Sequence, residues 1–179
     1  MNPQILIIMG SDSDYPVLQE TTKMLSKFDI PYEMHISSAH RSPAKTEALV
    51  AGAADRGIKI IIAAAGVAAH LPGVVAAGTI LPVIGVPMGG GSLNGVDALY
   101  SIVQMPGGIP VATMAIGKSG AKNAGILAAQ MLALSDVALA GKLVRFRQEM
   151  AQEVEEKDAC LQQRCLMSAG QKGVRYADS

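Results

Sequence analysis

Apolar runs of strand length alternate along the chain with longer segments of helical periodicity. Four runs are apolar at nearly every position, as is typical of strands buried on both faces of a parallel sheet: residues 4–9, 58–64, 80–86 and 110–116. A fifth run, residues 30–37, alternates apolar and polar positions, which makes His35 an ordinary half-exposed strand residue. The pattern therefore predicts five strands.

Helices are predicted between and after these strands. Apolar residues recur at helical spacing over 17–28, Ser42 and Pro43 look like an N-cap and a first-turn proline, and residues 123–134 are alanine-rich. A long amphipathic helix is expected from Ser135 to about Leu166. This order predicts an α/β, doubly wound, three-layer αβα sandwich with a central parallel sheet, whose ligands bind outside the carboxyl ends of the strands.

Length and charge favour one domain with a small-molecule partner. The 179 residues can bury a core without metals or disulfides, and we expect one domain over 1–166 and a flexible tail over 167–179. Fifteen basic and fifteen acidic residues balance, without the basic stripe that nucleic acid or a membrane surface requires. The uncharged stretch 60–88 is interrupted by His70 and by prolines, which argues against a membrane span.

Neither the N-terminal segment nor the cysteines suggest export. Residues 1–14 have no basic segment before their apolar run, so no signal peptide or anchor is expected. Cys160 and Cys165 lie in a charged segment without a nearby histidine, which indicates reduced thiols rather than a zinc site or a disulfide framework. We therefore expect a cytoplasmic protein.

The first strand is followed by the loop GSDSD, residues 10–14. Ser11 and Ser13 provide hydroxyl groups and the following helix provides unpaired backbone N–H groups, a combination that suits a phosphate. Asp14 is better suited to accept hydrogen bonds from a sugar diol. Capping of the helix by Ser13 or Asp14 explains the same residues without a ligand, and this alternative stays open.

A second loop, SSAHRSP at residues 37–43, sets His40 beside Arg41 between a strand and a helix. A guanidinium group can bind phosphate through two hydrogen bonds, and an imidazole exchanges a proton near neutral pH. The alternative is a surface His-Arg pair with Ser42 as the helix cap. We favour a functional role because this loop and GSDSD follow strands at the same end of the sheet.

The third loop lies in AAAGVAAHLPG, residues 63–73, and carries His70 at a strand-to-helix turn. Its glycine and alanines let a flat ligand approach the backbone closely. A core histidine satisfied by backbone groups is nevertheless the ordinary interpretation, and composition does not overturn it. No P-loop lysine, GxGxxG, HExxH or nucleophile elbow is present, and Gly89–Gly91 is interpreted as a flexible connector.

Taken in order, the loops GSDSD, SAHRSP and AAGVAAHLPG, followed by GVDALYSIVQMPGGIPVATMAIG and KNAGILAAQML, resemble the bacterial N5-carboxyaminoimidazole ribonucleotide mutases of purine biosynthesis (PurE, class I). The resemblance covers residues 5–134. It implies a flavodoxin-like domain and a homo-octamer with sites where subunits meet. It also implies interconversion of N5-carboxyaminoimidazole ribonucleotide and 4-carboxyaminoimidazole ribonucleotide, without ATP, metal or organic cofactor.

The resemblance also implies roles for individual residues. The phosphate of the small-molecule ribonucleotide would be held by Ser11, Ser13, Ser38 and Arg41, and the ribose hydroxyls by Asp14. His40 would be the general acid/base. The remaining residues would line the pocket around the imidazole and the migrating carboxylate: Gly66, His70 and Leu71. Of these, His70 is expected to be catalytic together with His40.

Three positions depart from the family pattern. Val67 stands where a smaller residue is usual, Gly89–Gly91 where polar residues are more varied, and Ala98 where serine is common. These departures leave the shape of the pocket rim and the subunit contacts open.

Two rival functions remain. The animal-type branch of the family carboxylates aminoimidazole ribonucleotide directly with CO2, but there lysine follows SAH and HLPG is absent, whereas this chain has Arg41 and residues 70–73. A non-catalytic receiver or flavin-binding module is the rival from another class. A receiver needs an acceptor aspartate where this chain has Ala64-Ala65-Gly66, and a flavin module usually has aromatic residues, which make up 3% of this chain.

Overall fold

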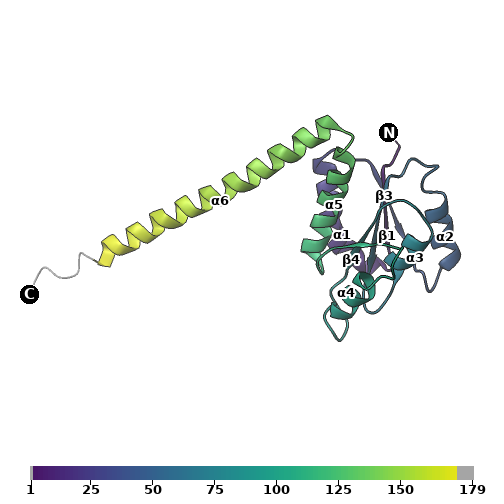
Figure 1. Cartoon of the computed structure of the whole chain (residues 1–179). Coiled ribbons are helices and arrows are strands. Elements are labelled where there is room, and N and C mark those ends of the chain that lie inside the picture. Colours follow the sequence, from purple (N-terminus) through teal and green to yellow (C-terminus); the bar gives the residue numbers. More distant parts are fainter. Residues whose placement is uncertain (1, 173–179) are drawn as a thin grey trace, which may run out of the picture. The chain divides into compact units, whose positions relative to one another are not determined.

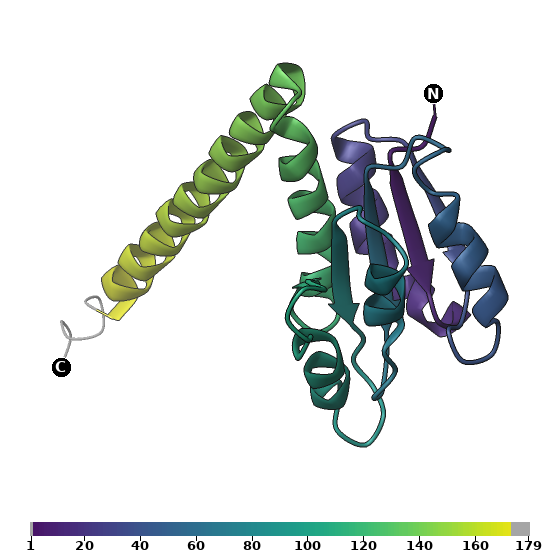
Figure 2. The same cartoon turned by 45° about the vertical axis from the view of Figure 1, so that its right-hand side comes forward.

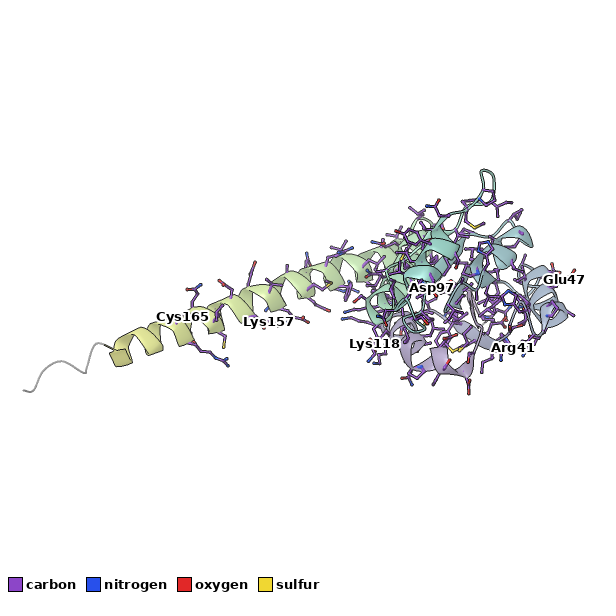
Figure 3. All side chains as sticks on the ribbon, turned by 90° about the horizontal axis from the view of Figure 1, so that it is seen from below. Arg41, Glu47, Asp97, Lys118, Lys157 and Cys165 are labelled. Carbon is purple, nitrogen blue, oxygen red and sulfur yellow. The ribbon has the colours of Figure 1, made fainter. Side chains whose placement is uncertain are left out.

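The computed structural model describes the backbone of residues 2–172 and the side chains of residues 2–165. Its contacts divide the chain into two compact units, Met1–Leu139 and Ala140–Ser179. The first unit carries every candidate site residue. The second consists largely of helix α6 (Val137–Lys172), whose side chains are all exposed over residues 147–165. Figure 3 shows these side chains, with Lys157 and Cys165 labelled.

The helix end differs from the sequence-based expectation. The contacts group residues 1–139 apart from residues 140–179, and the single domain over 1–166 stays a prediction. The tail predicted over 167–179 begins too early, since α6 continues to Lys172. Residues 173–179 lie outside the described part of the chain.

Five parallel strands form one sheet in the order β2-β1-β3-β4-β5. The strands β1, β3 and β4 are buried at every position, because helices cover both faces of the sheet (Figures 1 and 2). Their bounds are β1 Ile5–Met9, β2 Tyr32–Ile36, β3 Ile60–Ala65, β4 Val83–Pro87 and β5 Ala112–Thr113. The predicted α/β, flavodoxin-like sandwich with a parallel sheet and a long C-terminal helix is confirmed.

The helices of the sandwich lie on both faces of this sheet (Figure 2). Helices α1 and α5 pack against each other, with the hydroxyl of Thr21 donating a 2.7 Å hydrogen bond to the carbonyl of Ala121. A Cβ at Gly125 would lie 2.9 Å from the carbonyl oxygen of Thr21, so this glycine permits the close approach of the two helices. The bounds are α1 Tyr15–Lys27, α2 Pro43–Ala51, α3 Leu71–Ala77, α4 Val96–Val103 and α5 Lys118–Ala133, with a short 3-10 helix, η1, at Asp12–Asp14.

Two strands are shorter than their apolar runs suggest. Strand β4 begins at Val83 rather than at residue 80, because Pro82 has no N–H to donate and Ile80 is fully exposed. Strand β5 has only two residues, although the backbone N–H groups of Met114 and Gly117 still donate to β4 carbonyls over 2.9 Å. Helix α5 begins five residues before the predicted start at Asn123.

The strand order creates a switch point between β1 and β3. The chain leaves β1 towards the β2 edge and leaves β3 towards the β4 edge, so the loops after β1 and β3 diverge and open a crevice. Register places Met9 opposite Ile36 on one side and Ala64 on the other, and Ala65 opposite Pro87. Four loops therefore start at the same level of the sheet.

Candidate functional site

The loop after β1 is shaped by its own side chains. The hydroxyl of Ser11 accepts a 3.3 Å hydrogen bond from the backbone N–H of Ser13, and a carboxylate oxygen of Asp14 accepts one of 3.2 Å from the backbone N–H of Ser11. Together these bonds form a capping box around η1. Capping is thus real, but Ser11 rather than Ser13 provides it, and Asp14 makes no side-chain cap to α1.

Asp14 is the one acidic side chain that this loop buries, with 9% of its surface exposed. Burial raises the pKa of its carboxyl group, the hydrogen bond from Ser11 partly offsets that rise, and the neighbouring charge of Asp12 adds to it. The second carboxylate oxygen has no assigned partner among the hydrogen bonds above, and Asp14 lines the cavity described below. A hydroxyl-rich ligand is the type of partner that such a carboxylate accepts from.

The loop after β2 is closed by Ser38 and Ser42. The hydroxyl of Ser42 accepts from the N–H of Ser38 over 3.0 Å and donates to its carbonyl over 3.1 Å, and the hydroxyl of Ser38 accepts from the N–H of Arg41 over 3.2 Å. Ser42 is the N-cap residue of α2 and Pro43 its first residue, as predicted, but the Ser42 side chain bonds the loop instead of the helix. These bonds present His40 and Arg41 on a fixed turn.

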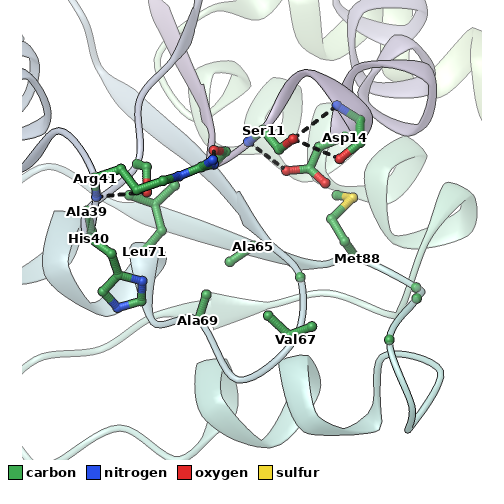
Figure 4. Close-up of a pocket in the computed structure, with 17 residues that line it drawn as sticks. Ser11, Asp14, Ala39, His40, Arg41, Ala65, Val67, Ala69, Leu71 and Met88 are labelled. Carbon is green, nitrogen blue, oxygen red and sulfur yellow. Dashed lines mark hydrogen bonds between the residues drawn. The ribbon is translucent and has the colours of Figure 1, made fainter.

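Arg41 joins the second loop to the first. Its guanidinium donates a 3.0 Å hydrogen bond to the carbonyl of Gly10, the residue that follows β1. This bond brings a positive charge to the side of the site where Ser11 lies (Figure 4). A guanidinium, two hydroxyls and the backbone N–H groups of η1 form a set of donors that suits a phosphate.

His70 precedes α3 as its N-cap residue and is hydrogen-bonded to the backbone of α4. Its Nδ1 is hydrogen-bonded to the carbonyl of Ser101 in α4, while the hydroxyl of Ser101 donates to the carbonyl of Ala69 over 3.2 Å. The imidazole covers Gly73, where an added Cβ would lie 1.8 Å from Nε2. His70 is not among the residues that line the cavity described below, and its bond to a backbone carbonyl fits the ordinary interpretation of a histidine satisfied by backbone groups; its place in the pocket stays a prediction.

The loop after β3 also contains a strained residue. Val67 has φ +47°, a left-handed conformation that β-branched residues rarely adopt, and 54% of its surface is exposed. In the sequence, this position differs from others only as a departure from a family pattern. No periodicity or composition reveals a positive φ at a valine.

A fourth loop completes the site and was missed as a functional segment. Met88 and Gly89–Gly91 follow β4 and line the cavity, although the sequence suggested only a flexible connector for the three glycines. A Cβ at Gly66 would lie 3.4 Å from Cβ of Met88, so the loops after β3 and β4 are in contact. The signal that could have found this loop was topological: it leaves a strand adjacent to β3 at the same level.

These four loops enclose one cavity of about 520 Å³ at the switch point (Figure 4). It is lined by eight of the nine predicted site residues: Ser11, Ser13, Asp14, Ser38, His40, Arg41, Gly66 and Leu71. Polar donors gather on the side of Ser11 and Arg41, whereas Ala65, Val67 and Ala69 provide apolar walls. A cavity of this kind can hold a phosphorylated molecule with a small flat ring beside an imidazole.

The described residues contain no cluster of three or more His, Cys, Asp or Glu side chains that could hold a metal ion. Within the same part of the chain, no helix has both the length and the apolar character that crossing a membrane requires.

The geometry agrees with comparisons to known proteins. Residues 4–153 match the family described as AIR carboxylase. The chain belongs to the AIR carboxylase family. An N5-carboxyaminoimidazole ribonucleotide mutase from Mycobacterium tuberculosis (strain ATCC 25618 / H37Rv) is 53% identical over 160 residues, which cover 89% of this chain and 91% of the relative. The resemblance deduced from the three loops is thereby confirmed.

Two further known proteins are similar to this chain. The phosphoribosylaminoimidazole carboxylase of Candida glabrata is 52% identical over 160 residues, which cover 89% of this chain but only 28% of that protein. The crystal structure of Treponema denticola PurE is 32% identical with a TM-score of 0.79, over 89% of this chain and 98% of that one. Both likenesses extend over the sandwich that carries the cavity.

Proposed function

We propose that this chain is an N5-carboxyaminoimidazole ribonucleotide mutase, an isomerase of purine biosynthesis. The observation that carries the proposal is the single cavity in which the anion-binding side of Ser11, Ser13 and Arg41 lies near His40. The 53% identity to a mutase over nearly the whole length of that relative supports it. Direct carboxylation of aminoimidazole ribonucleotide is the alternative, and the relative named for a carboxylase matches over only 28% of its length.

The donors of the cavity suggest how the ribonucleotide is held. Ser11, Ser13, Ser38 and Arg41 bind the phosphate, with Arg41 oriented by its hydrogen bond to the Gly10 carbonyl. One carboxylate oxygen of Asp14 accepts from the N–H of Ser11, and the carboxylate also accepts hydrogen bonds from the ribose hydroxyls. The ring then lies against Gly66 and Leu71, among small and apolar residues that let it approach the backbone.

The reaction moves a carboxyl group from nitrogen to carbon within the cavity. The bond between the exocyclic nitrogen and the carboxyl carbon breaks, the nitrogen keeps the electron pair and CO2 is released. Carbon 4 of the ring attacks CO2, which forms the new carbon–carbon bond, and then loses its proton. His40 takes this proton and returns a proton to the nitrogen, so that the overall change is an isomerisation. A close-fitting pocket keeps CO2 near carbon 4 between the two steps.

The experiment that separates the two activities supplies each substrate alone. Purified protein is incubated with the carbamate ribonucleotide, and separately with aminoimidazole ribonucleotide plus bicarbonate. The mutase proposal expects efficient product formation from the first mixture. Efficient use of the second alone would instead establish a carboxylase.

We also propose that the protein assembles as a homo-octamer and acts in the cytoplasm. Support for assembly comes from apolar side chains of α4 that are exposed in the single chain, namely Val96, Tyr100 and Val103. Support for a reducing compartment comes from Cys160 and Cys165, which are exposed thiols. Sedimentation velocity tests the assembly: a species with the mass of eight chains is expected, and a monomer at working concentration would refute it.

A further inference from the structure

Val67 occupies an unusual position at the rim of the cavity. It lies across the cavity from Ser11 and Arg41 in Figure 4, on the apolar side of the site. Its φ of +47° is strained for a β-branched residue, and more than half of its surface is exposed. A strained, exposed valine gains nothing from burial in a core, so its side chain needs another explanation.

The side chain of Val67 lies beside Gly91 of the facing loop. A Cβ built on Gly91 would lie 3.0 Å from Cγ1 of Val67, which is closer than ordinary van der Waals contact. The valine side chain thus fills the space that a side chain at Gly91 would need. Next to this contact, the loops approach each other again at Gly66 and Met88.

The facing loop is held in place by its own backbone. The N–H of Gly95 donates to the carbonyl of Gly90 over 3.1 Å, and the N–H of Asn94 donates to the carbonyl of Gly91 over 3.4 Å. Gly95 also packs so closely on this loop that a Cβ there would lie 2.8 Å from the Met88 carbonyl. Val67 therefore lies beside a loop that is held by its own hydrogen bonds, not beside a loose connector.

We propose that the Val67–Gly91 contact closes the cavity at the end where the ring lies and retains the released CO2. The inference rests on the proposed function, because only a reaction with a freed CO2 needs such a closure. If CO2 escapes, the nitrogen keeps its electron pair, takes a proton and leaves aminoimidazole ribonucleotide, so that turnover is wasted. Val67 acts here as a positioning residue: it limits the exit of CO2 and does not itself exchange a bond or proton.

Label retention is the measurement that tests this proposal. The carbamate ribonucleotide, labelled with 13C in its carboxyl group, is converted in the presence of excess unlabelled bicarbonate, and the label in the product is measured. The wild-type protein is expected to keep most of the label. Val67→Gly is expected to lower retention severalfold and to release more aminoimidazole ribonucleotide. Equal retention in both proteins would overturn the inference.

The Val67→Gly variant is informative because it should fold well. Glycine adopts φ +47° without strain, so its thermal midpoint should equal or exceed that of the wild type. Val67→Ala keeps the strain and shortens the side chain, and it should show intermediate retention. A lower kcat with unchanged retention in either variant would mean that the side chain supports the loop and closes nothing.

A double-mutant cycle tests the contact itself, independently of catalysis. Gly91→Ala should lower the thermal midpoint more in the wild-type background than in Val67→Gly, because the clash exists only when the valine is present. Gly90→Ala is the matched control: its φ is +137° and an added Cβ meets nothing within 4 Å, so its effect should be the same in both backgrounds.

The outcomes separate the inference from the function on which it rests. If the wild type transfers no carboxyl group at all, the proposed function fails. If it transfers the group but loses as much 13C label from the product as Val67→Gly does, the mutase function is supported and the role of Val67 in retaining CO2 is refuted. Additive effects of Gly91→Ala and Val67→Gly on the thermal midpoint would refute the contact.

Discussion

His40 and His70 occupy equivalent places in the topology and have different surroundings. Each follows a strand of the same parallel sheet and precedes a helix, α2 for His40 and α3 for His70. The His40 side chain is exposed and lines the cavity, whereas the imidazole of His70 is hydrogen-bonded to the carbonyl of Ser101 and covers Gly73. A place after a strand brings a histidine near the site, but its packed neighbours decide whether it can exchange protons with a ligand.

The largest effect is expected from His40→Asn. Removing a general acid/base typically lowers turnover roughly 10²–10⁴-fold, and kcat should fall in this range while nucleotide binding is kept. Steady-state kinetics and calorimetric titration with product measure the two quantities. His35→Asn is the control, because His35 lies on β2 near Glu33 and outside the cavity. Turnover at the wild-type rate in His40→Asn would refute its assignment.

Replacing Arg41 should weaken binding more than chemistry. A hydrogen bond to a charged group contributes about 1.5–3 kcal/mol, so Arg41→Ala should raise KM roughly 10- to 100-fold. Arg41→Lys keeps the charge but loses the forked guanidinium, so its KM should lie between those of the wild type and Arg41→Ala. The matched control is Lys45→Ala, which removes a nearby exposed cation that donates to the Ile36 carbonyl. If kcat falls and KM does not rise, Arg41 is not a phosphate ligand.

The positions of Arg41 and Asp14 follow from sequence because parallel topology fixes them. Two polar loops that follow neighbouring parallel strands must emerge at one edge of the sheet, and register then aligns Met9 with Ile36. Strand order and loop composition alone therefore predict most of the residues that line the cavity.

Other features depend on partners distant in the sequence. The orientation of His70 is set by Ser101, thirty-one residues later, and by the missing side chain of Gly73. Met88 and Gly89–Gly91 carry no distinctive chemistry, so only their place beside β3 reveals them. The positive φ of Val67 leaves no mark on periodicity. Such features are decided by packing rather than by local pattern.

Replacing Asp14 should affect the stability of the fold and the binding of the ribonucleotide in opposite directions. Burial raises the pKa of its carboxyl group in the folded protein, so the ionised form costs folding free energy at neutral pH. An aspartate in the unfolded chain has a pKa of about 3.9. The cost therefore builds up as the pH rises from this value through the raised pKa of the folded protein, and it disappears again as the pH falls back through that range. Asp14→Asn should therefore be at least as stable as the wild type at pH 7, with the advantage vanishing in acid.

Chemical denaturation of both proteins across this pH range measures the difference. Ribonucleotide affinity should fall about tenfold in Asp14→Asn, since one ionised acceptor for the ribose is worth roughly one strong hydrogen bond. Asp55→Asn changes an exposed carboxylate that is not part of the cavity and serves as the control. A stability advantage of Asp14→Asn that grows towards acid would contradict the stated origin of the shift.

The smallest effect is expected at His70, and it returns to the contrast with His40. His70→Ala removes the partner of the Ser101 carbonyl and should lower the free energy of unfolding by about 0.5–1.5 kcal/mol, with turnover reduced less than tenfold. His70→Asn places an amide N–H near the position of Nδ1, so it should recover most of that stability and turnover. Denaturation and kinetics on the same preparations test this. If His70→Asn restores stability but turnover stays as low as in His40→Asn, the imidazole itself takes part in the chemistry, and the distinction drawn between the two histidines is wrong.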